Sequence, residues 1–250
     1  MSSFSHKAII QDNTWYAPDI FCLKVKLPGI EPLPGQFFQV RVSEELDPFL
    51  NRPISVARYE RSVLHLIVRV VGRGTTLLSR KKPGEEIVLL GPFGNGIQPA
   101  RIKSVIIAGG IGVAPLLHVA QHLRTSKVPF MFLYGARHKR DLILTSEIRH
   151  MSDQCAIVAE EGYKKHRTVL QELSARSFDG FGRAYACGPR NMLVALQRIR
   201  LPMPVYAFCE DFLGCGCGLC LGCAIRYKGE YKRICEDGPV FELSEIDFNG

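Results

Sequence analysis

The sequence lacks a long uninterrupted hydrophobic run. Its longest apolar stretch, from Val105 to Leu117, contains three glycines and a proline, and it is too short to span the hydrocarbon core of a bilayer. The N-terminus also lacks a basic segment followed by an apolar one, which is the mark of a secretory signal. We therefore expect a soluble cytoplasmic protein that does not enter a membrane.

Other absences narrow the classes of function. The 250 residues contain no internal repeat and no low-complexity tract. The net charge of +8 comes from Lys and Arg residues spread along the chain, with no basic module interleaved with aromatic residues. Nucleic-acid binding is therefore not expected. The positive charge is available instead to attract an anionic nucleotide or an acidic protein partner.

Cysteine, in contrast, is concentrated near the end of the chain. Six of the nine cysteines lie between Cys209 and Cys235, and in a cytoplasmic protein disulfides are disfavoured because thiols stay reduced. Cys215, Cys220, Cys223 and Cys235 have the spacing C-x4-C-x2-C-x11-C, whose first part is typical of plant-type [2Fe–2S] ferredoxins. The intervening glycines allow the backbone to wrap closely and to aim N–H groups at sulfur.

A zinc site is the alternative for the same residues. Structural zinc sites favour two C-x2-C pairs; here Cys220 and Cys223 form one pair, and Cys235 has no partner two or three residues later. We favour iron–sulfur over zinc, and a zinc-binding interaction module stays as a separate hypothesis. The spacing leaves the first ligand open between Cys215 and Cys217, because Cys217 also stands in C-x2-C with Cys220.

The N-terminal third has the pattern of a β-domain. From Lys7 to Leu90, short runs of alternating apolar and polar residues are separated by Gly- and Pro-containing turns, which predicts an antiparallel barrel or sandwich. Within it, "NRPISV" contains Arg52, whose guanidinium suits a diphosphate. In "VRVVGRGTTLLSR", Gly74 and Thr75 begin a short predicted helix whose free N–H groups favour an anion.

The middle third changes to an alternation of strands and helices. "SVIIAGG", "FMFLYGAR", "CAIVAEEG" and "GRAYACGP" read as strands with a helical segment after each, which predicts a doubly wound parallel sheet that binds ligands at the carboxyl ends of its strands. The first strand-to-helix turn has Gly110 and Gly112 of the pattern G-x-G-x-x-G, but Pro115 replaces the third glycine. It is therefore not the standard dinucleotide fingerprint.

Taken together, these motifs resemble the ferredoxin–NADP⁺ reductase superfamily. The Arg-Pro-x-Ser and Gly-Thr motifs resemble its flavin-binding barrel, and "GGIGVAP" with "YACGPRNML" resembles its pyridine-nucleotide signature. The resemblance implies that FAD is contacted by Arg52, Pro53, Ile54, Ser55, Ile67, Val68, Arg69, Gly74 and Thr75. It implies that NAD(H) is contacted by Gly109, Gly110, Gly112, Cys187, Gly188 and Pro189.

The C-terminal segment narrows the resemblance. "CGCGLCLGC" followed by "CEDGPVF" is similar to the electron-transfer subunits of class B dihydroorotate dehydrogenases, and the similarity extends over essentially the whole chain. It implies cluster ligands Cys215, Cys220, Cys223 and Cys235, with Cys217 as a filler. It also implies an FMN-containing dihydroorotate dehydrogenase catalytic subunit as partner, in a heterotetramer, with electrons passing through [2Fe–2S] and FAD to NAD⁺. No side chain is predicted to act as a general acid or base.

We expect three units, a flavin barrel over residues 1–99, a nucleotide domain over 100–205 and a cluster segment over 206–250. Glu160 and Glu161 would repel a 2′-phosphate, which favours NADH over NADPH. The segment Tyr163–His166 departs from the small residues usual in the family and leaves that preference open. The alternative function is the flavin and iron–sulfur subunit of another NAD(P)H oxidoreductase, of the ferredoxin:NAD(P) transhydrogenase or sulfide dehydrogenase type.

Overall fold

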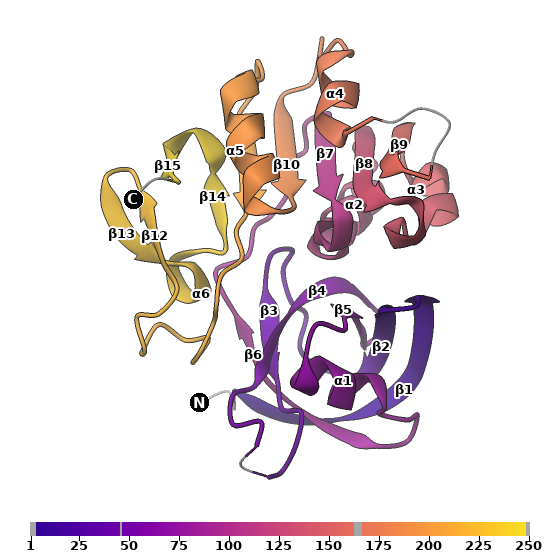
Figure 1. Ribbon diagram of the computed structural model, residues 1–250, viewed down its shortest axis with the longest axis vertical. Helices are drawn as coiled ribbons and strands as arrows, with labels where there is room; N and C mark the ends of the chain where they lie inside the picture. The colour runs from indigo at the N-terminus through magenta and orange to yellow at the C-terminus, as the bar shows by residue number, and fades with distance from the viewer. Residues whose placement is uncertain (1–3, 46, 163–166, 249–250) are drawn as a thin grey trace.

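The N-terminal third forms a closed antiparallel barrel. The computed structural model describes residues 4–45, 47–162 and 167–248, and Figure 1 shows the barrel as its lower part. The strands follow one another around the barrel in the order β1-β2-β5-β4-β3-β6. They are β1 (Ser5–Ala17), β2 (Ile20–Lys26), β3 (Phe37–Val40), β4 (Arg52–Glu60), β5 (Val63–Arg69) and β6 (Glu86–Phe93), and helix α1 (Arg73–Ser79) connects β5 to β6.

A six-stranded sheet with helices on both faces forms the second unit. Its strand order is β14-β11-β10-β7-β8-β9, and the five strands from β7 to β11 pair in parallel. They are β7 (Ser104–Gly109), β8 (Phe130–His138), β9 (Gln154–Glu161), β10 (Arg183–Cys187) and β11 (Val205–Phe208). The helices are α2 (Val113–Thr125), α3 (Thr145–Met151), α4 (Val169–Ser174) and α5 (Arg190–Ile199), with short 3-10 turns η1 (Gly110–Gly112) and η2 (Lys139–Asp141).

The continuous apolar runs of this sheet arise because both of its faces are buried. Along β7, Ile106 belongs to the core that includes α2, whereas its neighbours Val105 and Ile107 belong to the core that includes α4 and α5. Successive strand residues point to opposite faces, so an uninterrupted apolar strand fills two cores at once. The predicted doubly wound sheet is confirmed.

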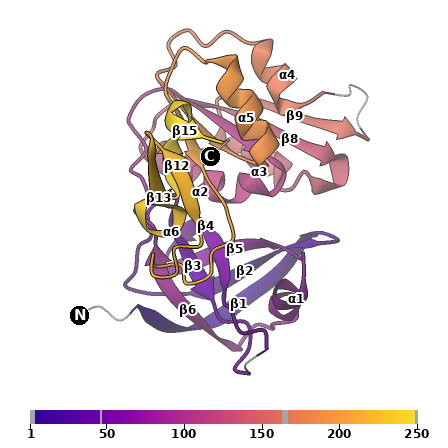
Figure 2. The ribbon, with the colours of Figure 1, turned by 60° about the vertical axis from the view of Figure 1, so that its left-hand side comes forward.

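The C-terminal segment joins both of the other units. It contains the antiparallel strands β12 (Ala224–Tyr227), β13 (Glu230–Arg233) and β15 (Ile246–Asp247), the helical turn α6 (Ile234–Asp237) and the 3-10 turn η3 (Leu243–Glu245). Its remaining strand β14 (Val240–Glu242) pairs antiparallel with β11 at the edge of the large sheet. Figures 1 and 2 show this yellow segment beside both the sheet and the barrel.

The barrel and the sheet domain are in direct contact through α2 and β4. The Gln121 side chain accepts a hydrogen bond from the N–H of Tyr59 (3.3 Å) and donates one to the Tyr59 carbonyl (3.0 Å). Arg58 forms an ion pair with Glu147, and outward-facing barrel residues such as Ile67 belong to the core formed by α2. Among the described residues, no helix has the length and apolar character needed to cross a membrane.

Candidate functional site

The predicted flavin residues line a cavity on the side of the barrel that faces the sheet domain. The cavity has a volume of about 320 Å³, and its wall includes eight of the nine: Arg52, Pro53, Ile54, Ser55, Ile67, Val68, Arg69 and Thr75. The Arg52 side chain lies over Gly74, where a Cβ atom would be 2.2 Å from Arg52 Nε. The structure thus brings the Arg-Pro-x-Ser and Gly-Thr motifs together, and a side chain at position 74 would force the guanidinium to move from this position.

Thr75 organises the turn before α1. Its hydroxyl accepts hydrogen bonds from the N–H groups of Val71 (2.9 Å) and Gly72 (3.2 Å) and donates one to the Gly72 carbonyl (3.0 Å). These two N–H groups precede α1, so the hydroxyl closes the turn before the helix and does not occupy the N–H groups of the helix start itself. Val71 and Thr75 of this turn line the cavity together with the charged Arg52.

Five of the six predicted nucleotide residues line a second cavity, at the carboxyl ends of β7 and β10, and Cys187 is not among the residues that line it. This cavity, of about 540 Å³, is lined by Gly109, Gly110, Gly112, Gly188 and Pro189. A Cβ atom on Gly112 would lie 2.6 Å from the Cys187 carbonyl oxygen. The two motif turns therefore pack backbone to backbone, which requires glycine at position 112. Their position at the carboxyl ends of parallel strands is where such sheets bind ligands.

The two cavities adjoin and share part of their lining. The shared residues are Arg69, Ile111, Cys209, Glu210 and Asp211. Arg69 is fixed between the units, because its Nε lies 3.3 Å from Asp19 Oδ2 in the barrel and its Nη2 lies 3.6 Å from Asp141 Oδ1 in the sheet domain. Groups bound in the two cavities would therefore meet at this junction.

Cys187 and Glu210 lie together at this junction. The Cys187 thiol is buried, and its Sγ lies 3.9 Å from Glu210 Oε1. Burial, and then the charge of Glu210, raise the pKa of the Cys187 thiol well above its usual value. Burial also raises the pKa of Glu210, although its contact with the Cys187 thiol opposes that shift. Cys187 is therefore a neutral thiol under the cavity floor, and Glu210 is the group that reaches the cavities.

The four predicted cluster ligands lie in two pairs. Cys223 and Cys235 are buried with their Sγ atoms 3.3 Å apart, and the Cys220 N–H donates to Cys215 Sγ at 3.4 Å. Each iron of a [2Fe–2S] cluster takes two thiolates, so two pairs fit this cluster. Within the described ranges, no three His, Cys, Asp or Glu groups converge as they would around one metal ion.

Backbone N–H groups point at the sulfur atoms of this segment, although burial, and then the contact with the Cys223 thiol, raise the pKa of Cys235 to about 12. The Gly218 N–H donates to Cys235 Sγ at 3.1 Å, and the Cys235 N–H donates to Cys223 Sγ at 3.5 Å. Partial burial raises the pKa of Cys215, but hydrogen bonds from the backbone of Cys217 and Cys220 outweigh it and lower that pKa to about 6. The pKa of Cys217 is raised, first by burial and then by its contact with Cys215. The donor set fits an iron–sulfur cluster and favours Cys215 over Cys217 as ligand.

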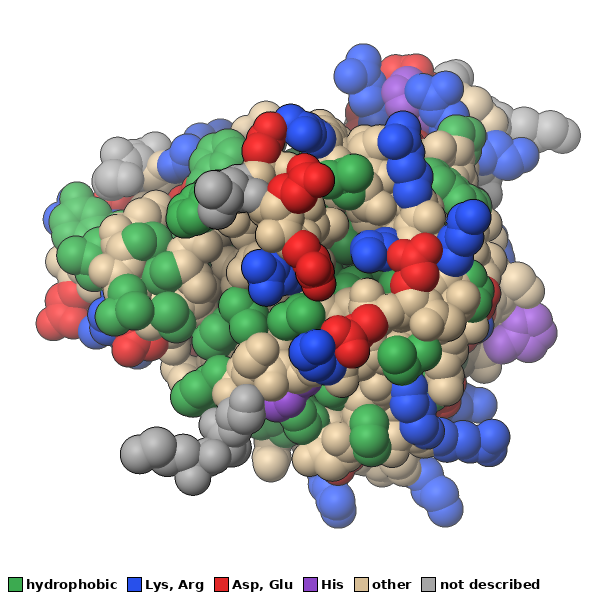
Figure 3. Space-filling view, turned by 90° about the horizontal axis from the view of Figure 1, so that it is seen from below, with side chains coloured by type: hydrophobic (Ala, Val, Ile, Leu, Met, Phe, Trp, Pro, Cys, Tyr) green, Lys and Arg blue, Asp and Glu red, His purple; other side chains and the backbone are tan. Residues whose placement is uncertain are grey.

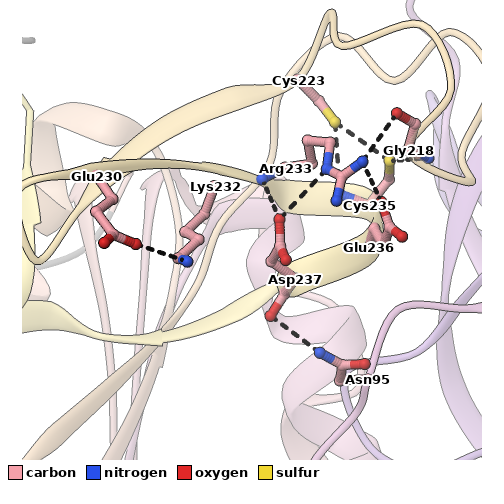
Figure 4. Close-up of polar contacts among 9 residues, drawn as sticks. All are labelled: Asn95, Gly218, Cys223, Glu230, Lys232, Arg233, Cys235, Glu236 and Asp237. Atoms are coloured by element: carbon pink, nitrogen blue, oxygen red, sulfur yellow. Dashed lines mark hydrogen bonds and ion pairs between the residues drawn. The ribbon is translucent and has the colours of Figure 1, made fainter.

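Arg233 holds the turn around Cys235 in place (Figure 4). Its N–H donates to Asp237 Oδ2 at 2.6 Å, and its guanidinium lies 2.7 Å from Glu236 Oε2 and donates to the Gly218 carbonyl at 3.4 Å. Gly218 has a φ of +81°, and a Cβ atom there would lie 1.9 Å from Glu236 Oε2. The Gly-rich loop can therefore close over Cys235 because position 218 has no side chain.

Several lining residues were not predicted from the sequence. Glu210, Asp211 and Leu213 follow β11 and line the flavin-side cavity. In the sequence they belong to no motif and only precede the predicted cluster ligands. Their place directly after a parallel strand was the available signal, because ligands bind at those ends. The expectation for Tyr163–His166 falls on residues outside those that the structure describes.

Solved structures define the class of the protein. The structure of an NADH-dependent reduced ferredoxin-NADP oxidoreductase is 26% identical, with a TM-score of 0.86 over 97% of this chain and 90% of that chain. Phthalate dioxygenase reductase is 20% identical, with a TM-score of 0.65 over 84% of this chain and 70% of that chain. The fold and the cysteine segment thus define a ferredoxin reductase-like protein with an iron–sulfur segment.

Sequence comparison identifies the family. Residues 210–247 match the iron-sulfur cluster binding domain of dihydroorotate dehydrogenase B, and residues 106–198 match the oxidoreductase NAD-binding domain. The dihydroorotate dehydrogenase B (NAD(+)) electron transfer subunit of Desulforamulus reducens is 36% identical, over 95% of this chain and 94% of that protein. The corresponding subunit of Caldanaerobacter subterraneus is 32% identical, over 97% of this chain and 98% of that protein. The chain belongs to the family of dihydroorotate dehydrogenase B electron transfer subunits, which confirms the resemblance seen in the sequence.

Proposed function

We propose that this chain conducts electrons from the FMN of a dihydroorotate dehydrogenase catalytic subunit, through a [2Fe–2S] cluster and FAD, to NAD⁺. The reaction would serve pyrimidine biosynthesis in the cytoplasm. This assignment is supported by the relatives, which are named as electron transfer subunits of dihydroorotate dehydrogenase B (NAD(+)). The three proposed units are a barrel over residues 1–99, a nucleotide domain over 100–205 and a cluster segment over 206–250.

One observation carries the proposal, namely that three predicted binding regions are contiguous in this chain. Glu210 and Asp211 line both the barrel-side and the nucleotide-side cavity. Leu213, two residues later, lines the barrel-side cavity and stands two residues before Cys215. A single backbone segment therefore runs from the junction of the cavities to the cysteine loop, which is the arrangement that a short electron path requires.

Each predicted group has residues that would hold it. Arg52 would contact the diphosphate of FAD with its guanidinium, and the glycine turns at Gly112 and Gly188 would admit the nucleotide backbone of NAD(H) close to the sheet. FAD would connect NAD(H) to the cluster, because a flavin exchanges two electrons with nicotinamide and single electrons with an iron–sulfur cluster. The chain's own residues orient these groups and limit the access of water to the junction.

The catalytic partner would dock beside the cysteine loop. Phe212, Leu219 and Leu221 are 92%, 84% and 66% exposed, although residues of this size and polarity are usually buried. Figure 3 shows hydrophobic side chains gathered at the left-hand end of the molecule, which is the end that carries the C-terminal segment in Figure 1. An apolar surface around an exposed Cys220 suits a protein partner that exchanges electrons with the cluster. We propose a heterotetramer of two such pairs.

Anaerobic purification tests the assignment. The loaded chain should contain one FAD and two irons, and NADH should bleach both chromophores. With the catalytic subunit added, dihydroorotate should then reduce NAD⁺, whereas ferredoxin or sulfide should not replace that partner. A colourless zinc protein would contradict the redox function, and activity only with ferredoxin or sulfide would favour the alternative oxidoreductases.

A further inference from the structure

Gln39 is a buried polar residue on the outside of the barrel. It lies on β3, where it pairs with Pro53 of the predicted flavin strand, and only 1% of its surface is exposed. Phe37, two residues earlier on the same face of the strand, lines the flavin-side cavity and packs in the core of the C-terminal segment. Gln39 therefore stands between the flavin strand and the cysteine segment.

The side-chain amide of Gln39 contacts the loop that leads into Cys215. Its Nε2 donates to the carbonyl oxygens of Leu213 and Gly214, each at 3.4 Å. The loop then lies directly against it, since a Cβ atom on Gly216 would be 2.7 Å from Gln39 Cγ and 2.8 Å from Nε2. The Oε1 of Gln39 is buried and has no hydrogen-bond partner among the described residues. A buried amide with one unsatisfied atom is costly to retain, so stability of the barrel is not its explanation.

A second barrel residue contacts the turn that follows the fourth predicted ligand, Cys235. Asn95 follows β6, and its side chain donates to the Asp237 carbonyl at 3.0 Å, as Figure 4 shows, while its backbone N–H donates to the Gly238 carbonyl at 2.8 Å. The barrel thus contacts the segment just before Cys215 and just after Cys235. These contacts fix the cysteine loop relative to the flavin strand and not merely within its own segment.

We propose that Gln39 is a positioning residue for the cluster, through which the flavin domain holds the loop 213–216 in the geometry that retains iron and exchanges electrons with the flavin. The inference rests on the proposed function, because it assumes that the loaded chain carries FAD and [2Fe–2S]. Leu213 lines the flavin-side cavity, so a shift of this loop changes both the Cys215 ligand and the separation of the two redox groups. Partners that orient metal ligands in this way typically affect metal affinity or activity by about 10- to 100-fold.

The test replaces Gln39 with Met, which keeps the length of the side chain and removes its hydrogen bonds. The matched control is Gln36→Met, because the hydrogen bonds described for the Gln36 amide do not involve the cysteine loop: Oε1 accepts from the Leu33 N–H and Nε2 donates to the Gly94 carbonyl, each at 2.8 Å. We expect Gln39→Met to bind FAD and be reduced by NADH like the wild type. It should release iron to a chelator about tenfold faster than the wild type and Gln36→Met.

Spectroscopy adds a readout that loss of stability alone would not change. In this assay NADH would supply the electrons, as a hydride to the flavin with a proton from solvent, and these would reach the oxidised cluster one at a time. For Gln39→Met we expect an altered electron paramagnetic resonance spectrum of the chemically reduced cluster and about tenfold slower cluster reduction after flavin bleaching. Gln36→Met should match the wild type in both. Gln39→Leu provides a second apolar variant should the Met variant fold poorly.

Two failures are distinguishable. A wild-type chain that carries no FAD or iron would overturn the proposed function and, with it, this inference. A loaded wild type whose Gln39→Met or Gln39→Leu variant has unchanged iron release, spectrum and cluster reduction would overturn only the role of Gln39. Equal defects in Gln36→Met and Gln39→Met would also overturn it, because they would point to a general effect on the barrel.

Discussion

The Sγ atoms of Cys223 and Cys235 lie 3.3 Å apart although twelve positions separate the two residues in the chain. The hairpin of β12 and β13 brings them together, because Ala224, next to Cys223, pairs with Arg233, two residues before Cys235. The fourth cysteine, remote in the spacing pattern, is therefore placed by ordinary antiparallel pairing.

Serine substitutions at Cys223 or Cys235 are expected to abolish cluster binding, because an alcohol does not replace a thiolate at this buried pair. Cys217→Ser should retain two irons per chain, since Cys217 is exposed and is a filler in our assignment. Iron and acid-labile sulfide analysis with a visible spectrum checks both outcomes. Loss of iron in Cys217→Ser, together with retention in Cys215→Ser, would reverse the choice of ligand.

Arg52→Ala is expected to weaken FAD binding by about 10- to 100-fold, the usual effect of removing a charged hydrogen-bonding partner. Gly74→Ala should act in the same direction, because its methyl group would displace the Arg52 guanidinium. Flavin fluorescence during titration of the apoprotein measures the affinity. Arg41→Ala, an exposed arginine of the same barrel, is the control, and an equal effect there would argue against a specific contact.

Leu219→Lys and Leu221→Lys are expected to weaken association with the catalytic subunit by at least about tenfold, because each places a charge on the proposed docking surface. The iron content should not change, since both side chains point into solvent. Calorimetric titration of the two subunits measures the effect. Ile102→Lys alters another exposed aliphatic residue, 43% exposed in the nucleotide domain, and should bind normally.

Acid is expected to destabilise the chain through His118 on α2. The ring is 7% exposed and its Nδ1 lacks a hydrogen-bond partner among the described residues. Burial, with a smaller contribution from His122, lowers the pKa of His118 from 6.5 to about 4. As the pH falls, His118 is protonated in the unfolded chain at a higher pH than in the folded chain. Its contribution to the free energy of unfolding is therefore fully present above about pH 6.5 and is lost as the pH drops towards 4.

His118→Leu should remove this component, which amounts to at most about 3 kcal/mol. Its unfolding midpoint in guanidinium should fall less between about pH 7 and pH 4 than that of the wild type. His150→Leu, at an exposed position, should leave the pH dependence unchanged. Identical pH profiles for His118→Leu and the wild type would show that another group dominates.

The sequence predicted the parts of the site that depend on local chemistry. Gly112 was singled out by the pattern G-x-G, and the structure adds that a Cβ atom there would meet the Cys187 backbone. Arg52 was singled out because a guanidinium suits a diphosphate, and its contact with FAD stays a prediction. Glu210 was not predictable in the same way, because nothing in "CEDFLG" shows that these residues line two cavities. Their position follows from where β11 ends against the barrel.

By itself the sequence determined the antiparallel barrel, the doubly wound sheet and the cysteine spacing. The first two follow from short-range periodicity of apolar residues, and the third predicts the cluster ligands. Tertiary structure alone decided that β14 from the cysteine segment extends the large sheet, that Leu213 lies in the flavin-side cavity, and that Gln39 contacts the cysteine loop across 174 positions. These contacts arise from packing between units whose surfaces carry no periodic pattern, and packing depends on the shape of the whole fold.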